Sequence, residues 1–470
     1  MAYAFQLLYG LAFSIALGPL FDVYLFQLGG GEHSGNKIVG TVESVSGLVA
    51  LGLALPVGVI VDTWNRVRLM RIAAVVGLLS SAMGCYAIAS SSINAWYVTM
   101  VLTGVYAELG NSVCYALFAD SLRSEDRQRA TENMGMISNI SMSVGPALTL
   151  VATVFIGDRW SQGNLEKVLM AGMAVLNPLA CMSMFLFTKA PFEQTGDEGE
   201  DEADSSPADG AAGAPRRGAK AVPYIIAFSD LLTCIGAGMT IKYFNLYWKN
   251  DWSMSPAQVL AISAVQPLSV AAFIKILQKP SQMCGRAQAS LCCFFSGVLA
   301  FVVLAEVKNL PVALVAYFIR SGMANAVYPL NKSIMFDFTP SNQRGRWNAI
   351  ETLSGSVWSG SAFIGGIMAD RYDYRFTFLV TAGIYLVGCG AYAPLLCIVP
   401  RRQPAGTADS KKPLLASPGR FQASPGRGGP FASPGLYVSP AARMNMGYQP
   451  MALTQDGGTN VVMNISEDAS

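Results

Sequence analysis

The chain has 470 residues, of which 52% are hydrophobic and 13% are charged, and its formal net charge at pH 7 is +2. Soluble domains average about 25% charged residues, so this composition, with a mean hydropathy of +0.39, argues against a soluble globular protein. The near-neutral charge and the lack of a basic stripe or of zinc-finger spacing argue against a nucleic-acid partner.

Long apolar stretches recur from the first residues to about residue 400. A transmembrane helix needs about 20 mainly apolar residues. A bilayer favours helices, because lipid-exposed backbone must satisfy its own hydrogen bonds. We therefore predict an all-α membrane protein whose helices form two pseudo-symmetric six-helix bundles around a central cavity. The twelve predicted transmembrane helices are residues 3–28, 36–61, 69–90, 95–118, 130–156, 165–188, 222–247, 256–277, 287–306, 311–334, 346–369 and 375–399.

Two polar segments divide the chain. The run from Glu193 to Asp204 is acidic and is followed by an Ala/Gly/Pro-rich stretch, and such a segment buries too little apolar surface to fold. The last part is of low complexity, with Ser-Pro steps and short sequences similar to endomembrane sorting signals. The linker is a flexible tether or a regulatory segment, and the tail is plain disorder or carries phosphorylation and sorting sites. We predict an N-terminal six-helix bundle at 1–188, a disordered cytoplasmic linker at 189–221, a C-terminal six-helix bundle at 222–399 and a disordered cytoplasmic tail at 400–470.

The Lys and Arg residues of the short loops are unevenly shared between the two sides of the membrane. One side carries 11 of them, namely Arg66, Arg68, Arg71, Arg123, Arg127, Arg129, Lys275, Lys279, Arg286, Arg344 and Arg346. The other carries 7, namely Lys37, Arg159, Lys167, Lys249, Lys308, Arg371 and Arg375. Cytoplasmic loops carry the excess of basic residues, and the first side also carries both polar segments. We therefore predict a multi-pass integral membrane protein with both termini in the cytoplasm, in the plasma membrane or in an endomembrane of the lysosome or vacuole type.

Acidic and basic residues recur at the same spacing in the predicted cytoplasmic loops. Gly58, Asp62, Arg66 and Arg68 follow this order after the second span. The pattern Asp120-x6-Arg127-x-Arg129 after the fourth span returns as Asp337-x6-Arg344-x-Arg346 after the tenth. This repetition is typical of a protein made of two similar halves, which indicates bundles that rock around a cavity.

These residues carry a resemblance to a known family. Over roughly residues 1–400 the chain resembles the major facilitator superfamily of secondary transporters, and it is similar to a eukaryotic branch of that family whose substrate is not assigned. Gly58, Asp62, Arg66 and Arg68 resemble the family's motif between helices 2 and 3, although Thr63 stands where a basic residue is frequent. The stretch from Gly365 through Asp370 and Arg375 resembles the family's join between helices 11 and 12.

The resemblance implies transport by alternating access and a charge network at the cytoplasmic side. Asp62, Arg66, Asp120 and Arg129 would latch the state that is open to the outside, since ion pairs at a bundle boundary can exchange partners between two arrangements. The alternative is that the charges serve membrane topology alone and stay solvated. The full predicted gate is Gly58, Asp62, Arg66, Arg68, Asp120, Arg127, Arg129, Asp337, Arg344 and Arg346.

Several ionisable residues fall inside predicted spans. Such a residue costs about 2.5–3.5 kcal/mol in mid-membrane, so it faces a cavity or a partner. The resulting candidates for a substrate or proton site are Asp22, Glu43, Glu108, Asp230, Lys242, Arg320 and Glu351, with the polar neighbours Asn111, Tyr115, Asn245 and Asn331.

Three arrangements among these candidates give specific expectations. Glu108, Asn111 and Tyr115 share one helical face, which lines the cavity or forms a polar patch between helices. Arg320 keeps its charge, so it needs an acidic partner or an anionic group of the substrate, and Asn331 lies three turns further along the same face. Asp22 and Lys242 lie at similar depth in the first and seventh spans, where they could form an ion pair.

We expect a secondary transporter that moves a small polar solute and is driven by a proton gradient, with Asp22, Glu43 and Glu108 as the coupling candidates. The alternatives are a transporter-like receptor or scaffold that signals through its tails, or a passive facilitator. The chain has one histidine, His33, in a predicted outer loop, and no zinc motif, so we expect neither an enzyme nor a cofactor or metal. The expected partners are the solute, protons and the lipid bilayer, with a monomer as the working state.

Overall fold

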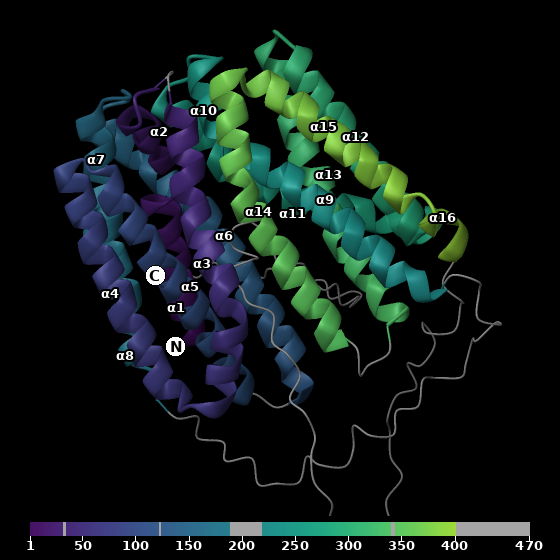
Figure 1. Cartoon of the computed structure of the whole chain (residues 1–470), viewed down its shortest axis with the longest axis horizontal. Helices are drawn as coiled ribbons and strands as arrows, with labels where there is room; N and C mark the ends of the chain where they lie inside the picture. Colours follow the sequence, from purple (N-terminus) through teal and green to yellow (C-terminus); the bar gives the residue numbers. More distant parts are fainter. Residues whose placement is uncertain (32–33, 122–123, 189–218, 340–343, 401–470) are drawn as a thin grey trace, which may run out of the picture.

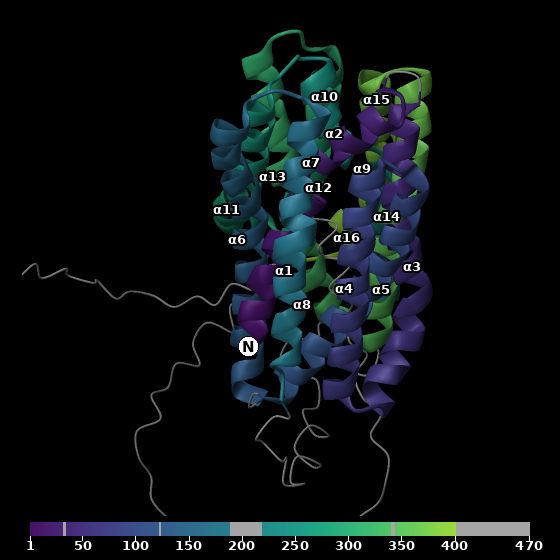
Figure 2. The ribbon, with the colours of Figure 1, turned by 90° about the vertical axis from the view of Figure 1, so that its left-hand side faces the viewer.

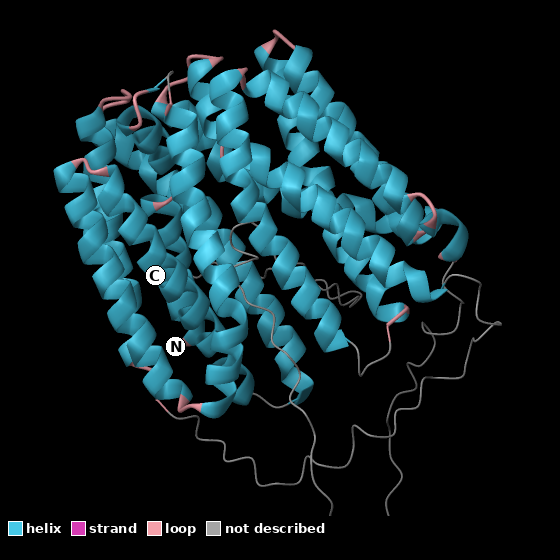
Figure 3. Ribbon diagram, viewed as in Figure 1, coloured by secondary structure: helices cyan, strands magenta, loops and turns pink. Residues whose placement is uncertain are grey.

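The computed structural model describes residues 1–31, 34–121, 124–188, 219–339 and 344–400. Within these ranges the chain is helical, with short loops and no strand (Figure 3). The predicted tail and nearly all of the predicted linker lie outside the described residues, so the expectation of disorder for them stays a prediction.

Each half of the chain forms a set of long helices. The first half has α1 (Ala2–Ala16), α2 (Pro19–Leu28), α3 (Gly35–Thr63), α4 (Arg66–Ser90), α5 (Ile93–Asp120), α6 (Ser124–Ile156), α7 (Gln162–Ala171), a π-helical segment (Gly172–Leu176) and α8 (Asn177–Phe185). The second half has a short 3-10 turn (Ala219–Ala221), α9 (Val222–Ile241), α10 (Phe244–Asn250), α11 (Pro256–Cys284), α12 (Arg286–Glu306), α13 (Leu310–Asp337), α14 (Arg344–Arg371), α15 (Tyr374–Tyr392) and α16 (Leu395–Ile398).

These helices form twelve spans in two bundles, as the sequence predicts. Ten stretches among the described residues are long and apolar enough to cross a membrane. The other two spans are α5 and α14, each of 28 residues, which corresponds to about 42 Å and exceeds a hydrocarbon core of about 30 Å. In Figure 1 the first bundle, purple to blue, lies beside the second, teal to yellow-green, and Figure 2 shows the helices roughly parallel.

Two spans are broken rather than continuous. The first span divides between α1 and α2, because Gly18 is extended and Pro19 cannot donate a main-chain hydrogen bond to the helix before it. The seventh span divides between α9 and α10, where the N–H of Tyr243 turns back to the carbonyl of Thr240 at 3.0 Å. The sequence predicted unbroken helices at both places. Since the breaks occupy equivalent positions in the two halves, they place irregular backbone at the same depth on both sides of the bundle interface.

Two helices extend beyond their predicted spans. The predicted loop from Lys275 to Arg286 is almost entirely the end of α11, which runs to Cys284. Helix α6 begins at Ser124, six residues before the predicted start of its span. Hydropathy marks where a helix leaves the hydrocarbon, whereas the helix itself can continue into water, so the predicted ends were too early.

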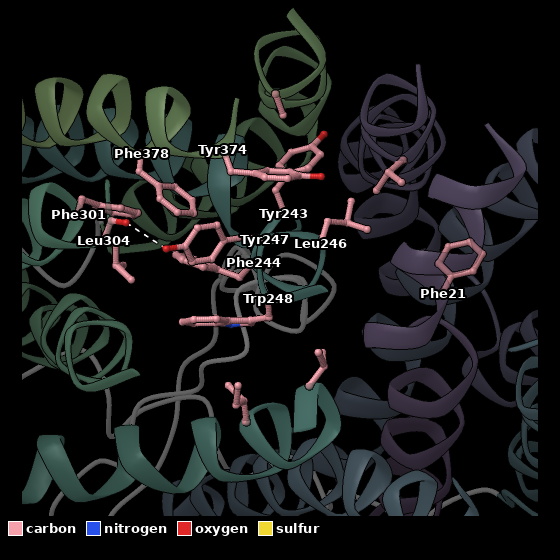
Figure 4. Packing of buried hydrophobic residues seen from close by; sticks show 14 of the residues in the cluster. Phe21, Tyr243, Phe244, Leu246, Tyr247, Trp248, Phe301, Leu304, Tyr374 and Phe378 are labelled. Carbon is pink, nitrogen blue, oxygen red and sulfur yellow. Dashed lines mark hydrogen bonds between the residues drawn. The ribbon is translucent and has the colours of Figure 1, made fainter. Parts of the chain in front are cut away.

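An aromatic cluster packs the interior of the second bundle. Figure 4 shows Phe244, Tyr247 and Trp248 of α10 against Phe301 of α12 and Phe378 of α15. The rings of Phe244 and Phe378 are stacked with their centroids 5.0 Å apart. These five side chains are buried. The cluster holds the short helix α10 in place although the chain is broken just before it.

Glycines bring the two bundles into close contact along α3 and α14. A Cβ on Gly40 would lie 2.6 Å from the carbonyl oxygen of Ala362, and one on Gly366 would lie 2.5 Å from that of Asn36. Ser44 donates to the carbonyl of Ser359 at 3.1 Å, also across the interface. In Figure 1 the bundles meet at the end that carries α2 and α10, which we call the closed end.

Candidate functional site

A cavity of about 190 Å³ lies between the two bundles next to both helix breaks. Its walls come from α1, α2 and α6 in the first bundle and from α9, α10, α11 and α13 in the second. The polar lining residues on which the chemistry depends are Asp22, Lys242, Asn245, Gln266, Arg320 and Asn325. Discontinuous helices that meet at a repeat interface are a typical setting for solute and ion sites in transporters.

Two acids and one lysine form a cluster at this cavity. The Nζ of Lys242 lies 2.9 Å from Oε2 of Glu43 on α3, in the other bundle. The Nδ2 of Asn245 donates to Oδ2 of Asp22 at 2.7 Å, again across the interface. Asp22 is 2% exposed and Glu43 is 8% exposed. The second carboxylate oxygen of each acid has no hydrogen-bond partner in the described structure.

The ion pair of Lys242 differs from the one that the sequence suggested. Asp22 and Lys242 lie on the same cavity wall, but the lysine pairs with Glu43 and Asp22 bonds to Asn245. The sequence placed Asp22 and Lys242 at similar depth correctly. It could not specify the facing helix, because the partner is set by how α3 packs against the second bundle.

Arg320 lines the same cavity from α13 and is 3% exposed. Its Nη2 donates to the hydroxyl of Tyr385 at 3.3 Å, and its Nε has no partner. The guanidinium lies over the rings of Phe301 and Phe244, at 4.8 and 5.5 Å from their centroids. Asn331 on the same helix is not at the cavity.

The polar face of α5 is inside the first bundle. Glu108 is 2% exposed, and the hydroxyl of Ser112 donates to it at 3.4 Å. Asn111 donates to the carbonyl of Ala107 at 2.9 Å, and Tyr115 belongs to the apolar core of this bundle. None of Glu108, Asn111 and Tyr115 lines the described cavity. Of the two expectations for this face, the packing agrees with a polar patch between helices.

Asp230 and Asn331 form a separate network inside the second bundle. Asn331 donates to Oδ1 of Asp230 at 2.9 Å and accepts from the hydroxyl of Tyr392 at 2.8 Å. Neither residue lines the described cavity. These bonds link α9, α13 and α15, so the two residues hold one bundle together.

The predicted cytoplasmic gate lies at the end opposite to the closed end. Arg66 bonds through Nε to the carbonyl of Val61 at 3.3 Å, Arg68 is exposed, and Gly58 has open space around it. Asp337 pairs with Arg286 within the second bundle. The side chains of Asp62, Asp120, Arg127, Arg129, Arg344, Arg346 and Glu351 lie outside the described structure.

Two carboxylates cap helices across the closed end. Asp370, at the end of α14, accepts hydrogen bonds from the main-chain N–H groups of Asn36 (3.0 Å) and Lys37 (2.7 Å) at the start of α3. Asp158, just after α6, accepts from the N–H of Ala257 at the start of α11 at 2.8 Å. The first N–H groups of a helix lack intrahelical partners and favour a negative charge, so each acid stabilises the contact between the bundles.

Several lining residues were missed by the sequence reasoning. Ser263, Gln266, Tyr317, Ser321 and Asn325 all face the cavity. Uncharged polar side chains cost little in a helix and are frequent in membrane bundles, so they carry no signal of their own. The breaks at Gly18-Pro19 and Lys242-Tyr243 would have indicated which parts of the neighbouring helices to examine.

Comparisons with known proteins agree with this architecture. The family profile described as Major Facilitator Superfamily matches residues 2–233 and again 226–441. A search of curated proteins finds no match. Among solved structures, the nucleoside transporter NupG is similar with a TM-score of 0.63 at 14% identity, over 84% of this chain and 98% of that chain.

Two further structures show the same fold. The xylose transporter XylE from E. coli, in an inward open conformation, has a TM-score of 0.59 at 15% identity, over 86% of this chain and 96% of that chain. A bacterial homologue of the human lysosomal transporter Spinster, in an inward-facing and occupied conformation, has a TM-score of 0.58 at 12% identity, over 85% and 98%. The repeated profile match over both halves, together with the two bundles and their shared cavity, shows that this multi-pass membrane protein belongs to the Major Facilitator Superfamily, a family of membrane transporters.

Proposed function

We propose that the protein is a proton-coupled secondary transporter that moves a small polar solute through the cavity between its bundles by alternating access. The observation that carries the proposal is the ion pair between Lys242 and Glu43, which crosses the bundle interface beside the cavity. In this reading the chain is a transporter and not an enzyme, and it works as a monomer.

Opening the closed end would break this pair together with the other contacts across the interface. The bond between Asn245 and Asp22 and the two helix caps cross it as well. A transporter needs such contacts, since a set of bonds that exists in one arrangement only can bias the equilibrium between two states.

Protonation supplies the coupling. The groups that act on Asp22 are Lys242 on α9, Glu43 on α3, Asn245 on α10 and the hydroxyl of Tyr243. Asp22 and Glu43 compete for one lysine, and each keeps an unbonded buried oxygen. A neutral carboxyl group costs less to bury than a carboxylate. We therefore expect proton binding to favour the closed arrangement of this end, and proton loss to favour its opening.

The excess of Lys and Arg places the termini and the predicted gate in the cytoplasm. The closed end then faces the outside, so the described conformation is the one that opens toward the cytoplasm. In the opposite state the predicted gate residues around Asp62 and Arg66 would come together. The same two-state device would operate whether the membrane is the plasma membrane or an endomembrane.

The test is transport by the purified full chain in liposomes that enclose a pH-sensitive dye. Sugars, nucleosides, amino acids and monocarboxylates are added outside in turn, and each uptake is followed together with the pH of the lumen. The proposal predicts that at least one class acidifies the lumen, and that Asp22→Asn abolishes the acidification. Glu306→Gln removes an exposed acid at the end of α12 and serves as the matched control, which should retain coupling.

Two results would count against the proposal. Equal solute uptake by the wild type and Asp22→Asn, without any change in lumenal pH, would make the protein a passive facilitator. The absence of uptake for every class, from protein shown to be folded, would favour the receptor alternative.

A further inference from the structure

Arg320 is a buried cation whose charge no described acid neutralises. It is 3% exposed on α13, in the middle of a span. The ion pairs recorded for the described side chains do not include it. An arginine in mid-membrane is costly, so it needs a compensating group.

The existing partners of Arg320 hold its position without supplying that charge. The hydroxyl of Tyr385 accepts one hydrogen bond at 3.3 Å, and the rings of Phe244 and Phe301 lie against the guanidinium. Nε is buried and unbonded. An arginine presents five donors in a rigid fork that matches a carboxylate. The side chain is therefore anchored on one side and lies on the cavity wall with unused donors.

The charges around the cavity leave room for one negative charge. Lys242 is already paired with Glu43, and Asp22 becomes neutral when it carries the proton proposed above. Arg320 then remains as the uncompensated charge of the lining. Its neighbours Gln266, Ser321 and Asn325 are neutral hydrogen-bonding groups on the same side of the cavity.

We infer that the cavity binds a small organic monocarboxylate, whose carboxylate group pairs with the guanidinium of Arg320 while the rest of the molecule lies against Tyr317 and the neutral polar groups. This inference rests on the proposed function and names its substrate class. Phosphate fits less well, because a dianion calls for a second cation and Lys242 is engaged by Glu43. Entry of one monocarboxylate with one proton would keep the cavity electrically neutral.

The test measures ligand binding by the purified full chain in detergent, at constant ionic strength, through the shift of its unfolding temperature. The probes are benzoate and lactate, their neutral analogues benzamide and lactamide, and inorganic phosphate. Any ligand that binds the folded state stabilises it. We expect at least one carboxylate to stabilise the protein and its amide to fail.

The variants locate that binding. Arg320→Gln should weaken the apparent affinity for the carboxylate about 10- to 100-fold, because it removes charge-assisted hydrogen bonds. Arg320→Lys keeps the charge but loses the fork, and should weaken binding about tenfold, so it serves if the glutamine variant does not fold. Arg371→Gln removes an exposed arginine and should leave the affinity unchanged.

Equal stabilisation by carboxylate and amide, stabilisation by phosphate alone, or unchanged carboxylate affinity in both Arg320 variants would each overturn the inference. Binding in detergent needs no proton gradient. Failure here would therefore leave proton coupling through Asp22 standing, whereas failure of the liposome experiment with intact carboxylate binding would remove the coupling and keep the site.

Discussion

Asp158 and Asp370 do the same work in the two halves of the chain. Asp158 follows the fifth span and accepts a hydrogen bond from the first turn of the eighth, and Asp370 ends the eleventh span and accepts two from the first turn of the second. Because the second and eighth spans, and the fifth and eleventh, are equivalent in the two halves, the closed end is held by a symmetric pair of caps. Each cap joins a helix of one bundle to an acid of the other.

Removal of both caps should therefore open this end. We predict that Asp158→Ala combined with Asp370→Ala shifts the ratio of closed to open molecules about 30-fold toward open, since each lost cap costs about 1 kcal/mol. The shift can be measured as the distance between spin labels at Ser90→Cys and Lys308→Cys, which lie at this end of α4 and beyond α12. Cys284, Cys292 and Cys397 are exposed thiols and would first be replaced by serine.

The Asp→Asn variants at the same two positions are the matched comparison. Asparagine still accepts a hydrogen bond but lacks the charge, so the distance distribution should move less than with alanine. An unchanged distribution in the double alanine variant would show that the caps do not hold the closed end.

The pair of Lys242 and Glu43 should be energetically coupled. Lys242→Met leaves a buried carboxylate without its partner, and we expect a loss of about 3 kcal/mol of stability in detergent. Lys242→Met combined with Glu43→Gln removes both charges and should recover most of that loss. The measurement is a double-mutant cycle on unfolding free energies, and additive effects of the two single variants would rule out the coupling.

Gly40 should be intolerant of a side chain in the closed state. A Cβ there would lie 2.3 Å from the hydroxyl of Tyr243 and 2.6 Å from the carbonyl oxygen of Ala362, so Gly40→Ala must separate α3 from α14. Gly52 on the same helix has nothing within 4 Å of an added Cβ. With the spin labels described above, Gly40→Ala should increase the open population and Gly52→Ala should not. Equal behaviour of the two variants would contradict the close packing.

The sequence predicted the architecture because hydropathy reports burial in lipid directly. Twelve apolar stretches and the six-plus-six division were readable without knowledge of any contact. The helix breaks were missed, because a 26-residue apolar run looks continuous when Pro19 or Lys242 is weighed by hydropathy alone. The ends of α6 and α11 were missed because helices continue past the hydrocarbon.

The site was predictable in its charged residues and not in its pairings. The cost of a buried charge singled out Asp22, Glu43, Lys242 and Arg320, and the structure places all four around one cavity. The same rule also selected Glu108, which lies in the packing of one bundle. Burial cost indicates that a residue needs a partner, but only the packing of helices decides whether that partner is another helix or a cavity.

The most direct test of the account is the pH dependence of the conformational equilibrium without any solute. The distance between labels at Ser90→Cys and Lys308→Cys would be measured in nanodiscs between pH 5.5 and 8. The account predicts that the closed population grows as the pH falls, because a neutral Asp22 is less costly to bury than its carboxylate, and that Asp22→Asn stays closed over the whole range. A distribution in the wild type that does not change with pH, or an identical pH response in Asp22→Asn, would contradict the claim that protonation of Asp22 controls the movement of the two bundles.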